Sequence, residues 1–296
     1  MPITNISIDC GGGRKIERIF VHRENKVFGL DTGDELFYTL HPITELFSFL
    51  TGNKFADKFL MNSNPSSEMR DVSITFSNGI VYKISFYPAE NKVFSESFYN
   101  GNELLLYRDR LDAVPIIGKG ISTEKGNLII DSLMSIERTM KDDHPLKLLR
   151  HSSFGYDAFI EFNRTVMYDF EEDSSGESSG SLSAFSFINS DFTDSELEIV
   201  NKIVPNILDA SIKEVKADGS YLIGNITLPK ESGGGGYRQI LNILKLLIRS
   251  AIDDDRTLIL CNWGNHLHPI VRNYIKTFPD LNIKGSVFLI DSKDED

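Results

Sequence analysis

The residues best suited to phosphate chemistry lie in the segment Glu231-Ser232-Gly233-Gly234, which overlaps a run of four consecutive glycines. Apolar side chains recur at helical spacing over residues 239–252, so this segment, named here the signature-like turn, should begin a long helix. Backbone N–H groups at a helix amino terminus and a serine hydroxyl can together bind a phosphate. The alternative interpretation is a flexible glycine turn without a ligand.

A second candidate position follows the short apolar run at residues 257–260, which is typical of a strand buried on both faces. An ATPase would end such a strand with an aspartate for Mg²⁺ and a glutamate that orients the attacking water. Cys261 and Asn262 occupy these positions. Cysteine is a poor ligand for Mg²⁺, and an amide cannot accept a proton, so we expect no catalysis here. We interpret Cys261 as a small buried hydrophobe.

Two further positions depart from ATPase chemistry in the same direction. The turn at residues 28–36 is in the place of a phosphate-binding loop, but Asp34 and Glu35 stand where a phosphate needs glycine and lysine. Lys293 follows the last apolar strand, where the family that the motif order resembles usually has a histidine that senses the γ-phosphate. His266 and His268 could suggest zinc, but only Cys261 lies at ligand spacing from them, so we expect no metal site.

The elements that must position these residues predict an α/β fold in one domain spanning residues 1–296. Residues 1–110 alternate as antiparallel strands around turns such as Ser77-Asn78-Gly79, with a helix expected at 43–50. Residues 111–190 read as helical or irregular, with a helix at 128–140 and a mobile, acidic Ser/Gly-rich loop at 171–181. Residues 191–296 alternate helices with buried strands, which indicates a mostly parallel sheet flanked by helices.

Within the last region the boundaries follow from local signals. Thr193 and Glu196 form a capping-box pattern that should begin a helix running to about residue 208. Strands are expected at 212–217 and 221–228, and Pro269 should begin a helix that ends near Phe278. A final buried strand is expected at 285–290.

Composition limits the functional classes. Of the 296 residues, 41% are hydrophobic, which is enough for a substantial core. The formal net charge of −12 argues against broad electrostatic binding to nucleic acid. No apolar stretch approaches the roughly 20 residues of a membrane span. Two cysteines and an amino terminus without leader features favour a cytoplasmic protein.

The order of these motifs resembles a known family. A serine-glycine turn, a helix, an apolar strand, Leu267-His268-Pro269, a helix and a last strand follow one another over residues 228–294. This resembles the ABC/SMC-like, AAA-type ATPases of prokaryotic anti-phage defence loci, the abortive-infection or RloA-like class. A fainter similarity covers residues 1–110, which resemble the antiparallel lobe of an ABC head. The resemblance implies that the signature-like turn acts in trans, on the γ-phosphate of ATP held by a partner subunit.

The preserved turn beside four altered positions predicts a pseudo-ATPase. The resemblance implies no cofactor in its own site, ATP and Mg²⁺ shared with a partner, and a partner that is an ABC-type ATPase or an effector such as a nuclease or toxin. Nucleic acid would be reached only through that complex, and no membrane is involved. One alternative is a divergent, active ATPase in which Asp31 or Asp255 replaces the missing carboxylate. Another is a structural adaptor that touches no nucleotide.

Overall fold

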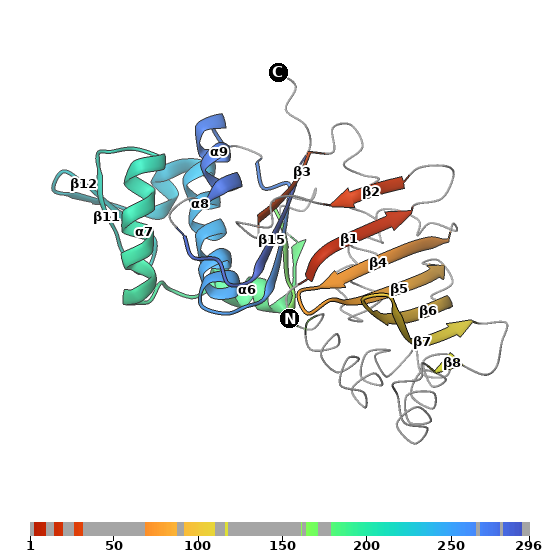
Figure 1. The fold of residues 1–296 in the computed structure, drawn as a ribbon. Helices are drawn as coiled ribbons and strands as arrows, with labels where there is room; N and C mark the ends of the chain where they lie inside the picture. Colours follow the sequence, from red (N-terminus) through yellow and green to blue (C-terminus); the bar gives the residue numbers. More distant parts are fainter. Residues whose placement is uncertain are drawn as a thin grey trace. The chain divides into compact units, whose positions relative to one another are not determined.

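The computed structural model describes residues 3–9, 15–19, 27–31, 69–87, 92–109, 116–117, 161, 164–170, 179–264, 267–278 and 281–291. The chain forms two compact units, which Figure 1 shows as ribbons. The first unit comprises Met1–Phe20 and Asp34–Thr165, and the second comprises Val21–Gly33 and Val166–Asp296. The helices expected at 43–50 and 128–140, and the positions Asp34, Glu35 and Lys293, lie outside the described residues.

The first unit contains a seven-stranded antiparallel sheet with strand order β2-β1-β4-β5-β6-β7-β8. Its β4–β5 hairpin turns at Asn78-Gly79 as predicted, because Gly79 has the positive φ of 85° that the turn requires. Inward residues of β4 are buried and alternate with more exposed ones, as expected for a sheet with one wet face. The strands are β1 Ile3–Asp9, β2 Lys15–Ile19, β4 Arg70–Phe76, β5 Ile80–Tyr87, β6 Lys92–Asn100, β7 Glu103–Asp109 and β8 Ile116–Ile117.

The second unit is built on a five-stranded sheet with order β10-β9-β14-β15-β3. The strands are β3 Val27–Asp31, β9 Val166–Asp169, β10 Ser179–Gly180, β14 Thr257–Cys261 and β15 Ser286–Asp291. β9, β14, β15 and β3 are mutually parallel, and β10 runs antiparallel at one edge. The predicted combination of an antiparallel amino-terminal sheet and a parallel carboxy-terminal sheet with helices is therefore confirmed.

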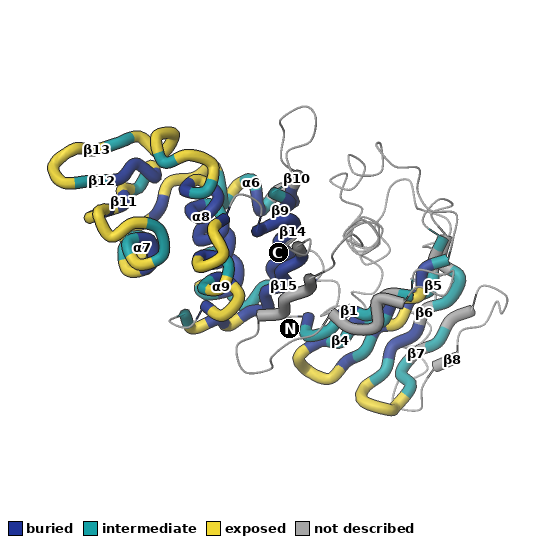
Figure 2. The backbone as a smooth tube through the Cα atoms, turned by 90° about the horizontal axis from the view of Figure 1, so that it is seen from above, coloured by how far each residue is buried: buried dark blue, intermediate teal, exposed yellow. Residues whose placement is uncertain are grey.

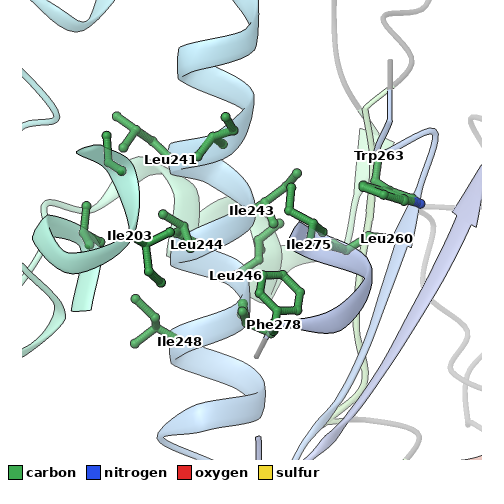
Figure 3. Close-up of a cluster of buried hydrophobic side chains, with 14 of the residues drawn as sticks. Ile203, Leu241, Ile243, Leu244, Leu246, Ile248, Leu260, Trp263, Ile275 and Phe278 are labelled. Carbon is green, nitrogen blue, oxygen red and sulfur yellow. The ribbon is translucent and has the colours of Figure 1, made fainter. Parts of the chain in front are cut away.

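Four helices accompany this sheet: α6 Leu182–Asn189, α7 Asp194–Ile207, α8 Gly234–Leu247 and α9 Pro269–Thr277. Thr193 and Glu196 form the predicted capping box of α7. α8 continues into one π-helical turn, Ile248–Ile252. Figure 3 shows α8 at the centre of the core, with Leu244 toward Ile203 of α7 and Leu246 on the side of α9 and the sheet. Alternate strand residues such as Leu258 and Leu260 join this core.

The strands of the parallel sheet are also buried on the face opposite to this core. Ile259, Phe288 and Ile290 alternate with the core residues along β14 and β15, and each is at most 1% exposed. Burial on both faces explains why these strands read as continuous apolar runs and not as alternating patterns. Figure 2 shows the same contrast, with β14 buried along its length and the segment between β13 and α8 exposed.

A small antiparallel sheet lies between α7 and α8 in sequence and contains β11 Ile212–Val215, β12 Tyr221–Ile223 and β13 Ile226–Leu228. The prediction of one strand over 221–228 is wrong, because Gly224-Asn225 forms a two-residue hairpin turn within it. The dipeptide Gly224-Asn225 is itself a hairpin signal in the sequence, and Gly224 adopts the positive φ of 61° that the turn requires.

The predicted mobile loop at 171–181 is also wrong at its carboxyl end. Ser179 and Gly180 pair with Asp169 and Tyr168 as β10, and the Ser181 side chain caps α6. Residues 171–178 lie outside the described residues. Among the helices that the structure describes, none is both long and apolar enough to cross a membrane.

Candidate functional site

The first candidate site is the edge of the five-stranded sheet at which β9, β14, β15 and β3 end, named here the carboxyl edge. Ligands of parallel α/β sheets bind beyond the carboxyl ends of the strands. The last paired residues are Asp169 of β9, Cys261 of β14 and, on β15 and β3, Asp291 opposite Asp31. Three of the four strands thus end in aspartate, whereas β14, the strand on which a magnesium-binding aspartate is expected, ends in cysteine.

Asn262 links the strands at this edge. It follows β14 in a left-handed conformation with a φ of 51°, which asparagine tolerates better than most residues. Its backbone N–H donates to the Ile290 carbonyl at 2.8 Å, and its side-chain Nδ2 donates to Oδ1 of Asp169 at 2.8 Å. Both side chains are buried, with Asn262 at 1% and Asp169 at 0% exposure. Asn262 therefore holds β9 and β15 against β14, and its amide is already engaged within the protein.

Asp169 is a site residue that sequence reasoning missed. The stretch before residue 170 is apolar without a clear period, because β9 is only four residues long and buried throughout. Nothing in the local sequence distinguishes Asp169 from a loop aspartate. Its position became visible only when β9 paired with β14, which lies about ninety residues later in the chain.

The two aspartates that were considered as replacement carboxylates lie at opposite edges of the sheet. Asp31 ends β3, so its backbone is at the carboxyl edge. Asp255 precedes β14 and is therefore at the amino edge. Since a strand rises about 3.3 Å per residue, Asp255 is about 20 Å from the carboxyl end of β14. Asp255 is thus not positioned to replace a carboxylate there, whereas Asp31 remains a candidate.

The second candidate site is the signature-like turn. Lys230–Gly233 forms a single 3₁₀ turn, and α8 begins at Gly234. Glu231, Ser232 and Gly234 are exposed, and Gly233 is partly buried. Gly234 adopts φ 73° and ψ −175°, a region that is essentially restricted to glycine. The structure therefore brings the four predicted residues together at the amino end of α8, where N–H groups are exposed.

Gly233 and Gly235 differ in what surrounds them. A Cβ on Gly233 would lie 2.5 Å from the Tyr237 ring, so packing alone requires glycine there. A Cβ on Gly235 would meet nothing within 4 Å, and no positive φ applies to it. Glycine within a helix is less stable than alanine by roughly 0.5–1 kcal/mol, so Gly235 lowers stability without a structural reason. A close approach of another molecule to the backbone would supply one.

The two candidate sites lie at the same end of the second unit. Gln239, in the second turn of α8, donates from Nε2 to the carbonyl of Trp263 at 2.7 Å. Trp263 directly follows Asn262 and is 1% exposed. Figure 3 shows the same relation, with Leu241 toward the end of α8 that is level with Trp263. The amino end of α8 and the carboxyl edge therefore face the same side of this unit.

Two cations, Lys245 of α8 and Arg249 of the π-helical turn that continues it, anchor this helix. Nζ of Lys245 donates to the carbonyls of Ile188 and Ser190, at 3.0 and 2.7 Å, and so caps the carboxyl end of α6. Burial lowers the pKa of Lys245, and the nearby Arg249 guanidinium adds to this shift. Arg249 donates from Nη2 to the Asp191 carbonyl at 2.6 Å. These contacts fix α8 relative to α6 and to the start of α7.

Arg249 also forms an ion pair with Glu196, the capping-box residue of α7. Its Nε donates to Oε1 at 2.5 Å and its Nη2 to Oε2 at 2.7 Å, which makes the pair bidentate. Burial alone would raise the pKa of Glu196, but hydrogen bonds from Arg249 and from the Thr193 backbone outweigh it. The pKa of Glu196 is therefore lowered from its ordinary value of 4.5.

His268 serves the start of α9. Its Nδ1 accepts a hydrogen bond from the Ile270 N–H at 3.3 Å, and Pro269 takes the first helical position. His266 lies outside the described residues. Within the part of the chain that the structure describes, no group of three His, Cys, Asp or Glu residues is arranged to hold a metal ion.

No protein-family model matches the chain, and a search of curated protein sequences finds no match. The functional argument therefore rests on the residues described above.

Proposed function

We propose that this chain is a pseudo-ATPase subunit with an ABC-type head: it hydrolyses no ATP itself and donates the signature-like turn to ATP bound by a partner subunit. The partner would be a catalytically competent ABC-type ATPase. By resemblance, the setting would be an anti-phage defence complex in which a nuclease or toxin acts as effector and contacts any nucleic acid.

The strand order supports the ABC-type assignment. The expected phosphate-loop strand is β3, the expected Walker B strand is β14, and the expected sensor strand is β15. These three strands are parallel and adjacent in the order β14-β15-β3, so their carboxyl ends lie side by side at the carboxyl edge. A nucleotide site of this class needs strand ends arranged in this way.

The observation that carries the loss of activity is the hydrogen bond from Asn262 to Asp169. In an active head the residue after the strand-ending aspartate orients the attacking water as a base. Asn262 instead donates its amide N–H to a buried carboxylate at 2.8 Å. The side chain at this position is used to hold the sheet together, and the preceding Cys261 is 0% exposed. Cys261 offers no side-chain oxygen for magnesium, and Asn262 offers no base for water.

The trans role rests on the exposed groups at the amino end of α8. The helix dipole is positive at that end, and its first N–H groups have no partners within the helix. Ser232 is exposed beside them, and Gly235 leaves the backbone open. A phosphate held by a partner could therefore approach N–H groups and a hydroxyl at once.

The decisive experiment uses two variants that the structure predicts to be harmless to folding. Ser232→Ala removes an exposed hydroxyl, and Gly235→Ala adds a methyl group into open space. A complex of this chain with a competent ABC-type ATPase is reconstituted, and its ATP turnover is measured. Ser232→Ala should lower turnover at least about tenfold, because one lost charge-assisted hydrogen bond contributes about 1.5–3 kcal/mol. Gly235→Ala should also lower turnover, because its methyl group would stand where a phosphate approaches the backbone. Full turnover with both variants would refute the trans role.

The matched control is Asn225→Ala, which is exposed and belongs to the turn between β12 and β13 and not to the signature-like turn. It should leave turnover unchanged. If all three variants lower turnover equally, the effect comes from assembly and not from contact with phosphate.

One observation favours the divergent-ATPase alternative: Asp31 and Asp291 end the adjacent parallel strands β3 and β15. Aspartate supplies the oxygen ligands that a hard cation prefers, so this alternative assigns the role of the missing aspartate to Asp31. Magnesium-dependent turnover by the isolated chain, abolished in Asp31→Asn, would establish that alternative. The adaptor alternative predicts equal partner affinity with and without ATP.

A further inference from the structure

Tyr237 is buried directly behind the signature-like turn. Its side chain belongs to the first turn of α8 and is 4% exposed, whereas Gly235 and Arg238 beside it are exposed. Its hydroxyl donates to the Gly219 carbonyl at 3.0 Å. Its ring lies 4.6 Å from the ring of Tyr221, measured between centroids. A single side chain of α8 thus contacts both β12 and the turn that precedes it.

The same ring fills the inner side of the signature-like turn. A Cβ on Gly233 would lie 2.5 Å from Cγ and Cδ1 of Tyr237, which is closer than real Cβ contacts occur. The backbone of the turn therefore lies directly against the ring. Any displacement of Tyr237 must be accommodated by the backbone at Gly233, because a tightly packed contact has no free volume to absorb it.

The reverse turn at residues 216–220 closes the arrangement from the other side. A Cβ on Gly219 would meet Cδ1 of Leu241 at 3.2 Å and the Lys230 side chain at 3.6 Å. The β11–β12 connection therefore packs close to Leu241 of α8 and to Lys230, the residue before the signature-like turn. Burial raises the pKa of Tyr237, with smaller contributions from Tyr221 and Asp218, so the phenol keeps the proton that it donates.

We infer that Tyr237 is a positioning residue that holds the signature-like turn in one conformation and ties it to the β11–β13 sheet. The ordering of the turn follows from these contacts alone. Its use in presenting Ser232 to a phosphate rests on the proposed function. A partner that binds the β11–β13 sheet would therefore act on the turn through Tyr237.

Amide hydrogen exchange on the full chain tests this inference without a partner or nucleotide. Three reporter amides are hydrogen-bonded in the structure: Gly219 to Lys216, Ser232 to Pro229, and Gly234 to Glu231. Tyr237→Phe removes only the hydroxyl and should speed exchange at Gly219 about fivefold, as expected for one net hydrogen bond. Tyr237→Ala should speed exchange at all three reporters at least about tenfold, because it leaves a cavity behind the turn.

The matched control is Tyr274→Ala in α9, which removes a partly buried ring that packs edge-on against Phe278. It should leave the three reporter amides unchanged. If Tyr237→Ala unfolds the second unit, as shown by loss of the fluorescence of the buried Trp263, the test of the inference rests on Tyr237→Phe alone.

The outcomes separate this inference from the proposed function. Reporter exchange that does not differ between the Tyr237 variants and the Tyr274 control overturns the inference. Selectively faster exchange supports it. If exchange is selectively faster but partner turnover is insensitive to Ser232→Ala and Gly235→Ala, the positioning role stands and the proposed function fails.

Discussion

Alanine substitutions at three neighbouring glycines should change stability in two opposite directions. Gly234→Ala forces a Cβ into a backbone region with φ 73° and ψ −175°, which should cost about 1–3 kcal/mol. Gly233→Ala places a Cβ 2.5 Å from the Tyr237 ring and should cost a similar amount, about 1–3 kcal/mol, through overpacking. Gly235→Ala meets nothing within 4 Å and should raise the free energy of unfolding by about 0.4–1 kcal/mol.

The assay is urea unfolding followed by tryptophan fluorescence. The chain has one tryptophan, Trp263, which is buried beside the carboxyl edge, so this signal reports the second unit and not the first. That selectivity matters because a chain of two units need not unfold in one step. A Gly235→Ala variant less stable than wild type, or a Gly234→Ala variant as stable as wild type, would refute the described geometry of the turn.

Three further results are expected from the same assay. Arg249→Leu should lower the free energy of unfolding by about 3–5 kcal/mol, because it leaves the buried Glu196 carboxylate without its bidentate partner. The lowered pKa of Glu196 adds stability that is fully present above pH 4.5 and is lost as the pH falls through the pKa of Glu196 in the folded state. Glu196→Gln should therefore make the free energy of unfolding decline less steeply over this acidic range. Asn262→Asp should lower stability by about 1–3 kcal/mol at neutral pH, and less at pH values where one carboxyl is protonated, because it replaces the donor to Asp169 with a second carboxylate.

Arg256→Leu is the matched control for the first of these results. Arg256 pairs with Asp254 at 2.8 Å, but both side chains are about one-third exposed. Such pairs contribute about 0–1 kcal/mol. Equal losses for Arg249→Leu and Arg256→Leu would contradict the structural role assigned to Arg249. For Asn262→Asp, a loss of stability relative to wild type that is the same at every pH would contradict the contact with Asp169.

Much of the second unit could be predicted because its signals are local. The Thr193–Glu196 capping box and the two apolar strands each depend on a few adjacent residues, and the structure contains them near the predicted bounds. The expected helix over 239–252 was found too, although it begins earlier, at Gly234. The glycine run continues into the helix instead of ending before it, since only Gly234 has a positive φ.

The residues that were not predicted depend on contacts distant in sequence. Arg249 reads as an ordinary charged residue on a helix, and its partners in α6 and α7 lie more than fifty positions earlier. Lys245 interrupts an apolar run and would be expected in solvent, yet it reaches the carbonyls after α6. The roles of Asp169 and Asn262 became clear only once β9 paired with β14. No local pattern encodes such pairings.

The sequence alone also could not show which glycines of the run the fold requires. In the sequence, the consecutive glycines of the run look alike. In the structure, Gly233 is required by the Tyr237 ring and Gly234 by its backbone angles, whereas Gly235 is required by neither. The flexible-turn interpretation accounts for none of these differences. Gly235, which was not among the predicted site residues, therefore gives the sharpest test of the proposed role in trans.

The central claim is that this head has lost its own nucleotide site, and calorimetry of the purified full chain with ATP and magnesium tests it most directly. The account predicts no heat of binding, because Cys261 and Asn262 are buried and place no carboxylate where magnesium would bind, and Asp34 and Glu35 oppose a phosphate. Magnesium-dependent binding, weakened by Asp31→Asn, would contradict the account and establish the carboxyl edge as an active nucleotide site.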